Sequence, residues 1–404
     1  MIKNITPDAA RDTLYALEVS PRTETIAIGD ALGRVAAENV FAGIHIPPFD
    51  CSLFDGYAFR SADTVTAARE SPVKLKITEE LPAGVSPTIN ITPGFAAKIL
   101  TGAPIPPGAD CTVKYEQTEY TASEVSVFAP AFPGSGIVYA GKDVKQGDCI
   151  SRCGSVITPT MMGLFASIGL TEAEVYAPPR AAIINTGTEL VEPGNPLQPA
   201  KIYNSNAFTL SGYLRGLGID AYNAGRVDDD IDAIAQRISA ALEDSDIVVT
   251  TGGASVGDYD CAIRVFEKLG AEVLFWKTQI KPGGAAAAAL LNGKLVLALS
   301  GNPGGAVAFL LRCCVPYIKK LCGYRDCFPE PIEVFLKTPV EKLSGHSRVL
   351  RGRLEIDGGR AYFAEYGDQG GGETSSFTSA EIIAEIPADS APLPAGTLVK
   401  AWRL

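Results

Sequence analysis

Apolar positions recur at two different spacings along this chain, and they predict alternating strands and helices in its second half. Between Arg180 and about Tyr324, short β-branched runs alternate with segments whose apolar residues recur at helical spacing. The runs that predict strands are AAIINTG, IDAYNAG, DIVVTTGG and EVLFWK, and helices are predicted at 205–217, 231–242 and 260–269. Two apolar runs around Asn292-Gly293 predict a hairpin, and SGNPGG leads into a final helix. This alternation predicts a parallel or mixed sheet with helices on both faces.

The segments on either side of this region have a different pattern. A helix is predicted over 5–19 with Thr6 as its N-cap, and another begins at Thr158. Between them, from about Ile44 to 146, prolines cluster between short β-rich runs, which indicates a small β-rich domain with long loops. After Pro331 the strands IEVFLK, VLRGRL, YFAEY and EIIAEIP follow one another closely, which predicts a small all-β domain or barrel.

Composition limits the classes of function. The 404 residues are 46% hydrophobic, typical of a globular multidomain chain, and a formal net charge of -11 argues against nucleic acid or an anionic membrane as a partner. The segment MIKNITPDAARD lacks the apolar core of a signal peptide, and no apolar stretch reaches membrane-spanning length, so a cytoplasmic protein is expected. Nine cysteines without a CxxC pair and only two histidines disfavour a zinc site, a disulfide framework or a histidine-based mechanism. Any catalysis should therefore use carboxylates, lysines and a metal ion.

Glycine-rich loops follow three of the predicted strands, at 185–189, 251–255 and 300–305. Open α/β sheets bind ligands beyond the carboxyl ends of their strands, where glycines let the backbone approach a ligand and helix N-termini attract anions. Turn geometry explains each loop by itself, but three along one sheet indicate a phosphate-bearing ligand. Asp258 and Asp260, at the end of IVVTTGGASVGDYD, could hold a divalent cation at the same edge.

Charged residues and rigid loops extend the predicted site. Lys277 and Lys281 could bind an oxyanion beside a metal-bound phosphate, with solvated surface lysines as the alternative. Aspartates 228–230 precede a predicted helix, and helix capping explains them without a ligand. Two proline-rich loops, PPFDCSLFDGYA and TGAPIPPGAD, have the rigidity of a preformed site. The residues alone therefore favour a metal-assisted site for a phosphorylated or oxyanionic ligand, and they leave the ligand unnamed.

Seven motifs in order resemble those of the molybdopterin molybdenumtransferase family, called MoeA in bacteria and the E domain of gephyrin in animals. They are PPFDCSLFDGYA, TGAPIPPGAD, AGKDV, INTGTEL, VTTGGASVGDYD, FWKTQIKPG and SGNPGGAVAF, and they span nearly the whole chain. The resemblance implies a multidomain α/β and β fold. Its parts are a MogA-like α/β domain with a mixed sheet (1–25 and 180–326), a linking domain (26–45 and 147–179), a β-rich inserted domain (46–146) and a C-terminal small β-barrel (327–404).

The resemblance also implies a reaction and its participants. Adenylylated molybdopterin and molybdate would be the substrates, and molybdenum would be inserted at the dithiolene with release of AMP and with Mg²⁺ as cofactor. A homodimer is implied, in which Asp55 and Thr101 of one chain complete the active site of the other. By motif position, the residues implied in catalysis are Asp55, Thr101, Asp143, Glu189, Asp229, Asp260, Lys277 and Lys281, and Glu189, Asp229 and Asp260 are the implied metal ligands. The residues implied in binding are Gly187, Thr188, Gly252, Gly253, Ser255, Gly301 and Asn302, with Arg351 and Ser376 as looser matches.

The sequence departs from the family pattern at several positions, which are Cys51, Phe54, Lys142, Gly284, Ala285 and Ser300. Gly284-Ala285 stand where the family has Lys-Pro, so one cation of the implied oxyanion site is missing. A paralogue that uses tungstate or has altered activity therefore stays open, as does a non-catalytic molybdopterin-binding or scaffold protein on the same fold. A related βα-domain enzyme acting on another nucleotide is a further alternative, although proteins of that kind lack the two proline-rich loops.

Overall fold

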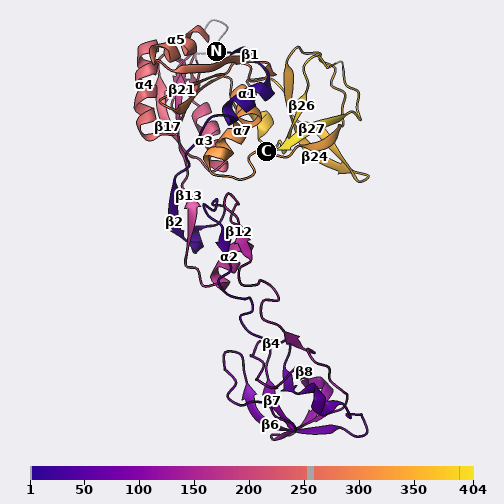
Figure 1. The fold of residues 1–404 in the computed structure, drawn as a ribbon. Helices are drawn as coiled ribbons and strands as arrows, with labels where there is room; N and C mark the ends of the chain where they lie inside the picture. Colours follow the sequence, from indigo (N-terminus) through magenta and orange to yellow (C-terminus); the bar gives the residue numbers. More distant parts are fainter. Residues whose placement is uncertain (1, 253–258, 391) are drawn as a thin grey trace.

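The chain forms an elongated molecule in three tiers, and both termini lie in the same end tier (Figure 1). The computed structural model describes residues 2–252, 259–390 and 392–404. The chain starts in the end tier, runs through a narrow middle tier to a β-rich lobe at the far end, and returns by the same route (Figure 1). Residues far apart in the sequence therefore meet in the upper two tiers, whereas the lobe is built from one continuous segment.

The end tier contains a seven-stranded mixed sheet, which confirms the predicted fold class. Its order is β1-β19-β21-β22-β18-β14-β17, and neighbouring strands are parallel except where β21 pairs. The strands are β1 (Ile2–Ile5), β14 (Arg180–Thr186), β17 (Asp220–Val227), β18 (Ile247–Thr251), β19 (Glu272–Thr278), β21 (Ala287–Leu291) and β22 (Lys294–Leu299). Leu291 pairs with Lys294 across the Asn292-Gly293 turn, and both turn residues have positive φ, so the predicted hairpin is confirmed.

Helices cover both faces of this sheet. On one face pack α1 (Pro7–Tyr15), α3 (Asn206–Gly216), α6 (Pro303–Phe309) and α7 (Val315–Leu321), and on the other α4 (Ile231–Asp244) and α5 (Tyr259–Lys268). The Thr6 hydroxyl caps α1 by accepting from the Ala9 amide at 3.3 Å, as its sequence position predicts. The predicted helix over 5–19 is shorter in the structure: residues 2–5 form an edge strand beside β19, and the helix ends at Tyr15. That pairing depends on a strand more than 270 residues away in the sequence, so local periodicity does not reveal it.

The middle tier is a pair of short ribbons and one helix. Strand β2 (Thr23–Ala27) pairs with β13 (Glu172–Tyr176), and β3 (Val40–Phe41) pairs with β12 (Cys149–Ser151). Helix α2 (Pro159–Ser167) begins after the cap Thr158 and buries Phe165 against them. Each ribbon pairs an outgoing strand with a returning one, so the middle tier holds the two ends of the lobe together.

The lobe is a strongly rolled six-stranded sheet with the order β8-β5-β7-β6-β10-β9. Its strands are β5 (Gly56–Phe59), β6 (Val73–Leu81), β7 (Phe95–Ile99), β8 (Cys111–Lys114), β9 (Thr118–Tyr120) and β10 (Glu124–Val127). The rings of Tyr57 on β5 and Tyr120 on β9 lie 5.8 Å apart although three strands separate them in the sheet. The sheet therefore curls into a barrel whose inner face buries Phe59 and Leu75.

A second barrel packs beside the seven-stranded sheet. Its strands are β23 (Ile332–Leu336), β24 (Ser347–Asp357), β25 (Arg360–Glu365), β26 (Ile382–Ile386) and β27 (Leu398–Arg403), and a pairing of β24 with β26 closes the ring. The predicted C-terminal small β-barrel is thus confirmed. Strand β20 (Ile280–Lys281), which follows β19, adds to β24 in parallel and joins the barrel to the sheet.

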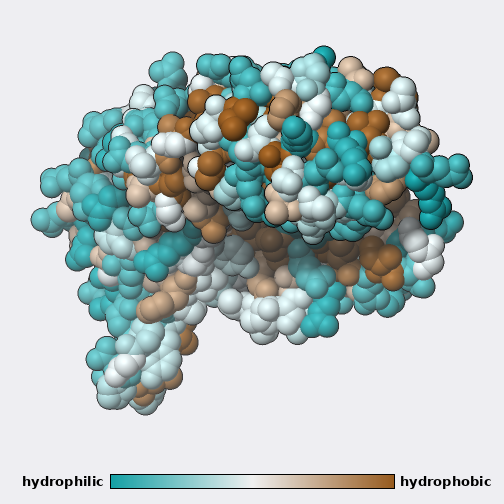
Figure 2. All heavy atoms as spheres, turned by 90° about the horizontal axis from the view of Figure 1, so that it is seen from below, coloured by the Kyte–Doolittle hydropathy of each residue, from teal (hydrophilic) through white to brown (hydrophobic). Residues whose placement is uncertain are grey.

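On the face drawn in Figure 2, apolar residues form separate groups among hydrophilic ones. Among the residues that the structure describes, no helix combines the length and apolarity needed to cross a bilayer.

Candidate active site

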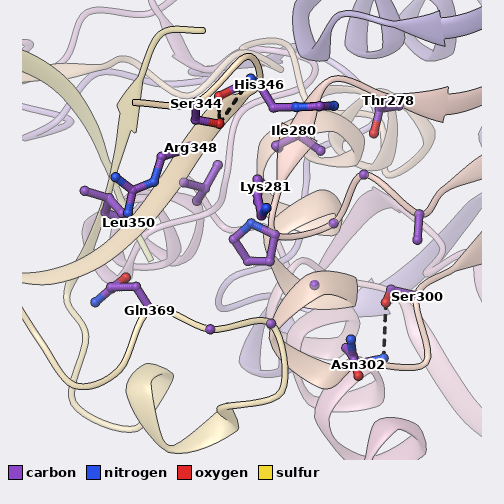
Figure 3. A pocket seen from close by; sticks show the side chains of 18 of the residues that line it. Thr278, Ile280, Lys281, Ser300, Asn302, Ser344, His346, Arg348, Leu350 and Gln369 are labelled. Atoms are coloured by element: carbon purple, nitrogen blue, oxygen red, sulfur yellow. Dashed lines mark hydrogen bonds between the residues drawn. The ribbon is translucent and has the colours of Figure 1, made fainter. Parts of the chain in front are cut away.

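A cavity of about 1270 Å³ lies between the seven-stranded sheet and the C-terminal barrel. One wall comes from the chain around β19 and β20 and from the start of α6, and the other from the barrel loops 342–346 and 367–371. In Figure 3, Lys281 lies between Arg348 and Gln369 of the barrel and Ser300 and Asn302 of the sheet domain. The cationic side chains that line the cavity are Lys277, Lys281, Lys342 and Arg348.

Both predicted lysines lie in this cavity, and strand pairing explains how. Lys277 has a φ of 65°, and its amide donates to the Ala286 carbonyl at 2.9 Å, which fixes the irregular end of β19. Lys281 is placed by β20, which pairs with Arg348 of β24. The sequence thus predicted the two lysines of one wall, whereas Lys342 and Arg348 of the facing wall were missed because no local motif contains them.

Gly284 lies in a turn too tight for a side chain. A β-carbon there would stand 2.8 Å from the Ile280 carbonyl oxygen and 2.9 Å from that of Thr278. The Gly284 carbonyl in turn accepts from the Thr278 amide at 3.0 Å. The lysine that is missing at this position could therefore not be restored without moving the backbone, and the departure from the family pattern involves the loop conformation as well as the charge.

The third predicted glycine-rich loop, residues 300–305, packs against the backbone of the barrel loop at Gly371. The amide of Gly305 donates to the Gly371 carbonyl at 3.2 Å, and a β-carbon on Gly304 would stand 2.9 Å from that same oxygen. These glycines let a loop of the C-terminal barrel approach the start of α6. Asn302 in the same loop lines the cavity, so only part of the predicted phosphate-binding loop faces open space.

Arg351 and Ser376, which the resemblance implies as binding residues, are both buried and are hydrogen-bonded to each other. Arg351 is 0% exposed, and its guanidinium donates to Ser376 Oγ at 3.0 Å and to the carbonyls of Asp368, Gln369 and Gly370 at 2.9 to 3.2 Å. Burial lowers the pKa of Arg351, against the raising effect of nearby carboxylates such as Glu373. In this structure Arg351 therefore holds the loop that lines the cavity and contacts no open space itself.

Two predicted carboxylates lie against the Gly187–Thr188 backbone, at the carboxyl ends of β14 and β17. The Glu189 carboxylate lies over Gly187, 2.5 Å from where a β-carbon would stand, and Asp229 Oδ2 is 3.4 Å from the amide of Thr188. Their neighbours in the aspartate run have other partners. Asp230 caps α4 through the Ala233 amide at 2.8 Å, and Asp228 pairs with Arg226 at 2.9 Å. Capping thus explains one aspartate of three, and Asp229 faces the loop.

A buried amide and hydroxyl network ties the sheet-edge loops together, and the sequence analysis missed it. Asn206, the first residue of α3, donates to Thr251 Oγ1 at 3.3 Å and to the Gly301 carbonyl at 2.8 Å. Asn185 donates to the same Thr251 hydroxyl at 2.5 Å. Gly301 packs on Gly252, since a β-carbon on Gly301 would lie 3.2 Å from the Gly252 α-carbon. Asn185 begins the predicted loop 185–189 and Asn206 lies at the start of the predicted helix 205–217, but their convergence requires the folded sheet.

Some implied residues cannot be placed. Gly253 and Ser255 lie outside the described residues, and so does the side chain of Asp260, whose backbone belongs to α5. Within residues 2–252, 259–390 and 392–404, no three His, Cys, Asp or Glu side chains are grouped as a protein-only metal cage would need. The carboxylates of Glu189 and Asp229, which both lie against the Gly187–Thr188 backbone, suit Mg²⁺, which usually takes one or two carboxylates and completes its shell with water and phosphate oxygens.

Asp55 and Thr101 meet each other in the lobe, far from the cavity in the same chain (Figure 1). Asp55 Oδ1 accepts from the Thr101 amide at 2.7 Å and from its hydroxyl at 2.9 Å. These hydrogen bonds lower the pKa of Asp55, amide first, against a smaller raising effect of burial. Asp143 lies where the lobe joins the middle tier, and its backbone amide donates a hydrogen bond to the Ile46 carbonyl at 3.0 Å. Within one chain, the structure does not bring these three residues to Glu189.

Replacing Thr101 by valine should raise the pKa of Asp55 towards its ordinary value of 3.8, and only in part because the amide bond remains. A pKa depressed by hydrogen bonds keeps the carboxylate charged to lower pH, so the pair stabilises the lobe above that ordinary value and loses this effect as pH falls. Carboxyl-carbon NMR titration of labelled aspartate measures the change. Asp63, which accepts from the Gly94 amide in the same lobe, is the control, and an unmoved Asp55 titration in Thr101→Val would contradict the prediction.

Comparison with known proteins covers all three tiers. Family models match as the MoeA N-terminal region (domains I and II) over residues 5–169, a probable molybdopterin binding domain over 182–320, and the MoeA C-terminal region (domain IV) over 333–404. The chain is 32% identical over 375 residues to a molybdopterin molybdenumtransferase of Staphylococcus aureus, covering 93% of this chain and 90% of the relative. It is 36% identical over 310 residues to that of Bacillus subtilis, covering 75% and 72%.

A solved structure agrees over the full length. The molybdopterin biosynthesis MoeA protein from Pyrococcus horikosii superposes with a TM-score of 0.87 at 30% identity, covering 99% of both chains. Sequence relatives, family models and structure thus point to one family, and they do so through every tier of the fold. The chain belongs to the molybdopterin molybdenumtransferase family, and it is a transferase of molybdenum cofactor biosynthesis.

Proposed function

We propose that this chain inserts molybdenum from molybdate into adenylylated molybdopterin, with cleavage of the phosphoanhydride and release of AMP. The observation that carries the proposal is that an acidic region and a cationic cavity lie along the same edge of the sheet. The carboxylates of Glu189 and Asp229 lie at one end of the sheet edge, and the cavity lined by Lys277 and Lys281 lies at the other. The packing of Gly252 on Gly301 joins them. A ligand with a phosphoanhydride at one end and a metal-accepting group at the other suits this arrangement.

The two regions would divide the work. Lys277, Lys281 and Arg348 supply positive charge for a molybdate dianion and for the phosphate of the pterin part. Glu189 and Asp229 would hold Mg²⁺ against the phosphates of the substrate. When bound, Mg²⁺ neutralises charge that develops on the departing AMP. Asn206 keeps the loops of these regions in register through Thr251 and Gly301.

We further propose a homodimer in which the Asp55–Thr101 pair of one chain completes the site of the other. The support is the separation of this pair from Glu189 within one chain (Figure 1). Asp55 is exposed, and its hydrogen bonds with Thr101 fix its orientation, as a group that serves a second chain would need.

Mixing Asp55→Ala and Glu189→Ala chains should therefore restore activity that neither variant has alone. Each mixed dimer would carry one intact site, so about half the sites of verified mixed dimers should turn over. Wild-type chains taken through the same dissociation and mixing steps are the control. Mixed dimers without activity would show that each site is built within one chain.

The deciding experiment for the reaction is a molybdate-dependent AMP-release assay with adenylylated molybdopterin and Mg²⁺. Release of AMP together with a molybdenum-loaded pterin supports the proposal. Binding of the substrate without turnover would identify a molybdopterin-binding scaffold instead. Titrating molybdate and tungstate in parallel tests the other alternative, because a chain devoted to tungstate would saturate at lower tungstate concentration. The expected compartment of the reaction is the cytoplasm.

A further inference from the structure

The rolled sheet of the lobe has an open mouth to which no residue role has been assigned above. A cavity of about 570 Å³ opens there, lined among others by Tyr57, Lys98, Glu80 and Tyr120. Small-molecule sites of this size are common in the mouths of β-barrels. The mouth also differs from the rest of the barrel interior, which is filled with apolar side chains such as Phe59 and Leu75.

Strand register brings a base, an acid and an aromatic ring into one row at this mouth. Tyr57 pairs with Lys98 across β5 and β7, and Lys98 pairs with Glu80 across β7 and β6. Lys98 Nζ donates to Glu80 Oε1 at 3.0 Å and lies 5.9 Å from the Tyr115 ring centre. One edge of a planar ligand could therefore hydrogen-bond to the Glu80 carboxylate and the neighbouring Lys98 ammonium group at the same time.

Two buried hydroxyls beside this row lack partners. Tyr57 is 0% exposed, and within the described part of the chain neither its hydroxyl nor that of Tyr115 has a hydrogen-bond partner. Buried polar groups are nearly always hydrogen-bonded, so the orphaned hydroxyl of Tyr57, which lines the cavity, indicates a missing partner there, whereas Tyr115 is not among the lining residues. Burial raises the pKa of both tyrosines to about 12, so both hydroxyls keep their protons at neutral pH and can donate. The Tyr120 ring is 58% exposed and offers a face for stacking.

The mouth is at the same end of the barrel as the Asp55–Thr101 pair. Asp55 comes directly before β5, and Thr101 is the second residue after β7, so both flank the strand ends that carry Tyr57 and Lys98. The Tyr115 amide also donates to the Asp55 carbonyl at 3.3 Å. A ligand that reaches Asp55 could thus place another part of itself in the mouth.

We propose that this mouth binds a planar 2-amino-4-oxopyrimidine ring, the hydrogen-bonding edge that pterins and guanine share. The Glu80 carboxylate accepts from the adjacent amino and ring N–H donors, Lys98 and the Tyr57 hydroxyl donate to the carbonyl and ring nitrogens, and Tyr120 stacks on the ring. Adenine lacks the carbonyl and presents a nitrogen acceptor beside its amino group, which a carboxylate repels. Resting on the proposed function, the ring is the pterin of the substrate whose phosphates reach the partner chain.

Direct titration of the full chain with 2-amino-4-oxopteridine, followed by ligand fluorescence without molybdate or Mg²⁺, tests this site. Saturable binding is expected, with displacement by guanosine and none by adenosine. Lys98→Met and Glu80→Gln should each weaken binding about ten- to hundredfold, the effect of one charge-assisted hydrogen bond. Lys74→Met is the matched control, because Lys74 pairs with Glu124 at 3.2 Å on the outer face of the same sheet, and it should leave binding unchanged.

Several outcomes would overturn the site. They are no binding to wild-type chain, equal binding by adenosine, and equal effects of Lys98→Met and Lys74→Met. Tyr57→Phe removes only the hydroxyl, and failure of this conservative variant to weaken binding would show that the hydroxyl faces no ligand. The result is separable from that of the proposed reaction, because pterin binding is measured without turnover. Pterin binding without AMP release rejects the reaction alone, and AMP release with an unchanged KM in Lys98→Met rejects the pterin site alone.

Discussion

Replacing Glu189 by glutamine is expected to slow AMP release at least about a hundredfold while leaving the fold intact. The change removes one negative charge and almost no volume from a side chain that is exposed beside Gly187. A metal ion that neutralises phosphate charge in the transition state supplies several kcal/mol, and weakening its hold by one carboxylate removes a large part of that effect. Raising the Mg²⁺ concentration should recover part of the activity, since the Asp229 ligand remains.

The control for this substitution is Asp228→Asn, in the neighbouring aspartate run. Asp228 forms a solvent-exposed pair with Arg226 at 2.9 Å, and its side chain is 64% exposed, so its loss should change AMP release less than about threefold. The assay is the initial rate of AMP release across a Mg²⁺ titration. Wild-type rates for Glu189→Gln at low Mg²⁺ would refute the metal-holding role of this residue.

Replacing Arg312 by methionine is expected to lower the free energy of unfolding by about 3–5 kcal/mol, the usual cost of leaving a buried ionic partner alone. Arg312 is 6% exposed and bonds Glu385 of β26 at 2.8 Å and Asp8 of α1 at 2.6 Å. The Glu385 side chain is only 15% exposed, so it would lose its partner inside the protein. These bonds join the first helix, the segment after α6 and the C-terminal barrel, so the cost should appear as loosened packing between the sheet domain and the barrel.

Urea unfolding followed by tryptophan fluorescence measures this effect, because Trp276 and Trp402 lie in the two parts that Arg312 joins. Arg11→Met is the matched control. Arg11 bonds the same Asp8 at 2.9 Å, but this pair is exposed to solvent and should contribute no more than about 1 kcal/mol. Equal losses in the two variants would show that burial does not decide the value of the Arg312 contacts.

The same ion pairs predict how stability depends on pH. Burial alone would raise the pKa of Asp8, but the hydrogen bond and charge of Arg312 outweigh it and lower the pKa below its ordinary 3.8. A depressed carboxyl pKa stabilises the folded chain above the unfolded value, and this stabilisation is lost as pH falls through the folded pKa. The difference in stability between wild type and Arg312→Met should therefore shrink below about pH 4. A difference that stays constant down to pH 2 would contradict this origin.

The amino-acid sequence by itself determined the local elements of this protein. The Thr6 and Asp230 caps, the Asn292-Gly293 hairpin and the alternation of strands and helices depend on residues close together in the chain. Each is stabilised by short-range hydrogen bonds and dihedral preferences, so a local pattern suffices. Lys277 and Lys281 share this property, since both flank one strand end and reach the same cavity.

Only the tertiary structure decided which loops meet and which polar groups are buried. Sequence motifs assigned Arg351 and Gly304 to a ligand site. In the structure Arg351 is buried beneath the 367–371 loop, and the missing side chain of Gly304 lets that loop pack closely. The edge strand β1, the Asn206 network and the cavity wall at Arg348 depend on contacts across more than 40 residues of sequence. Such contacts form only when the sheets assemble, because the burial and pairing that stabilise them come from strands distant in the sequence. A local sequence pattern does not specify which distant strands will pair.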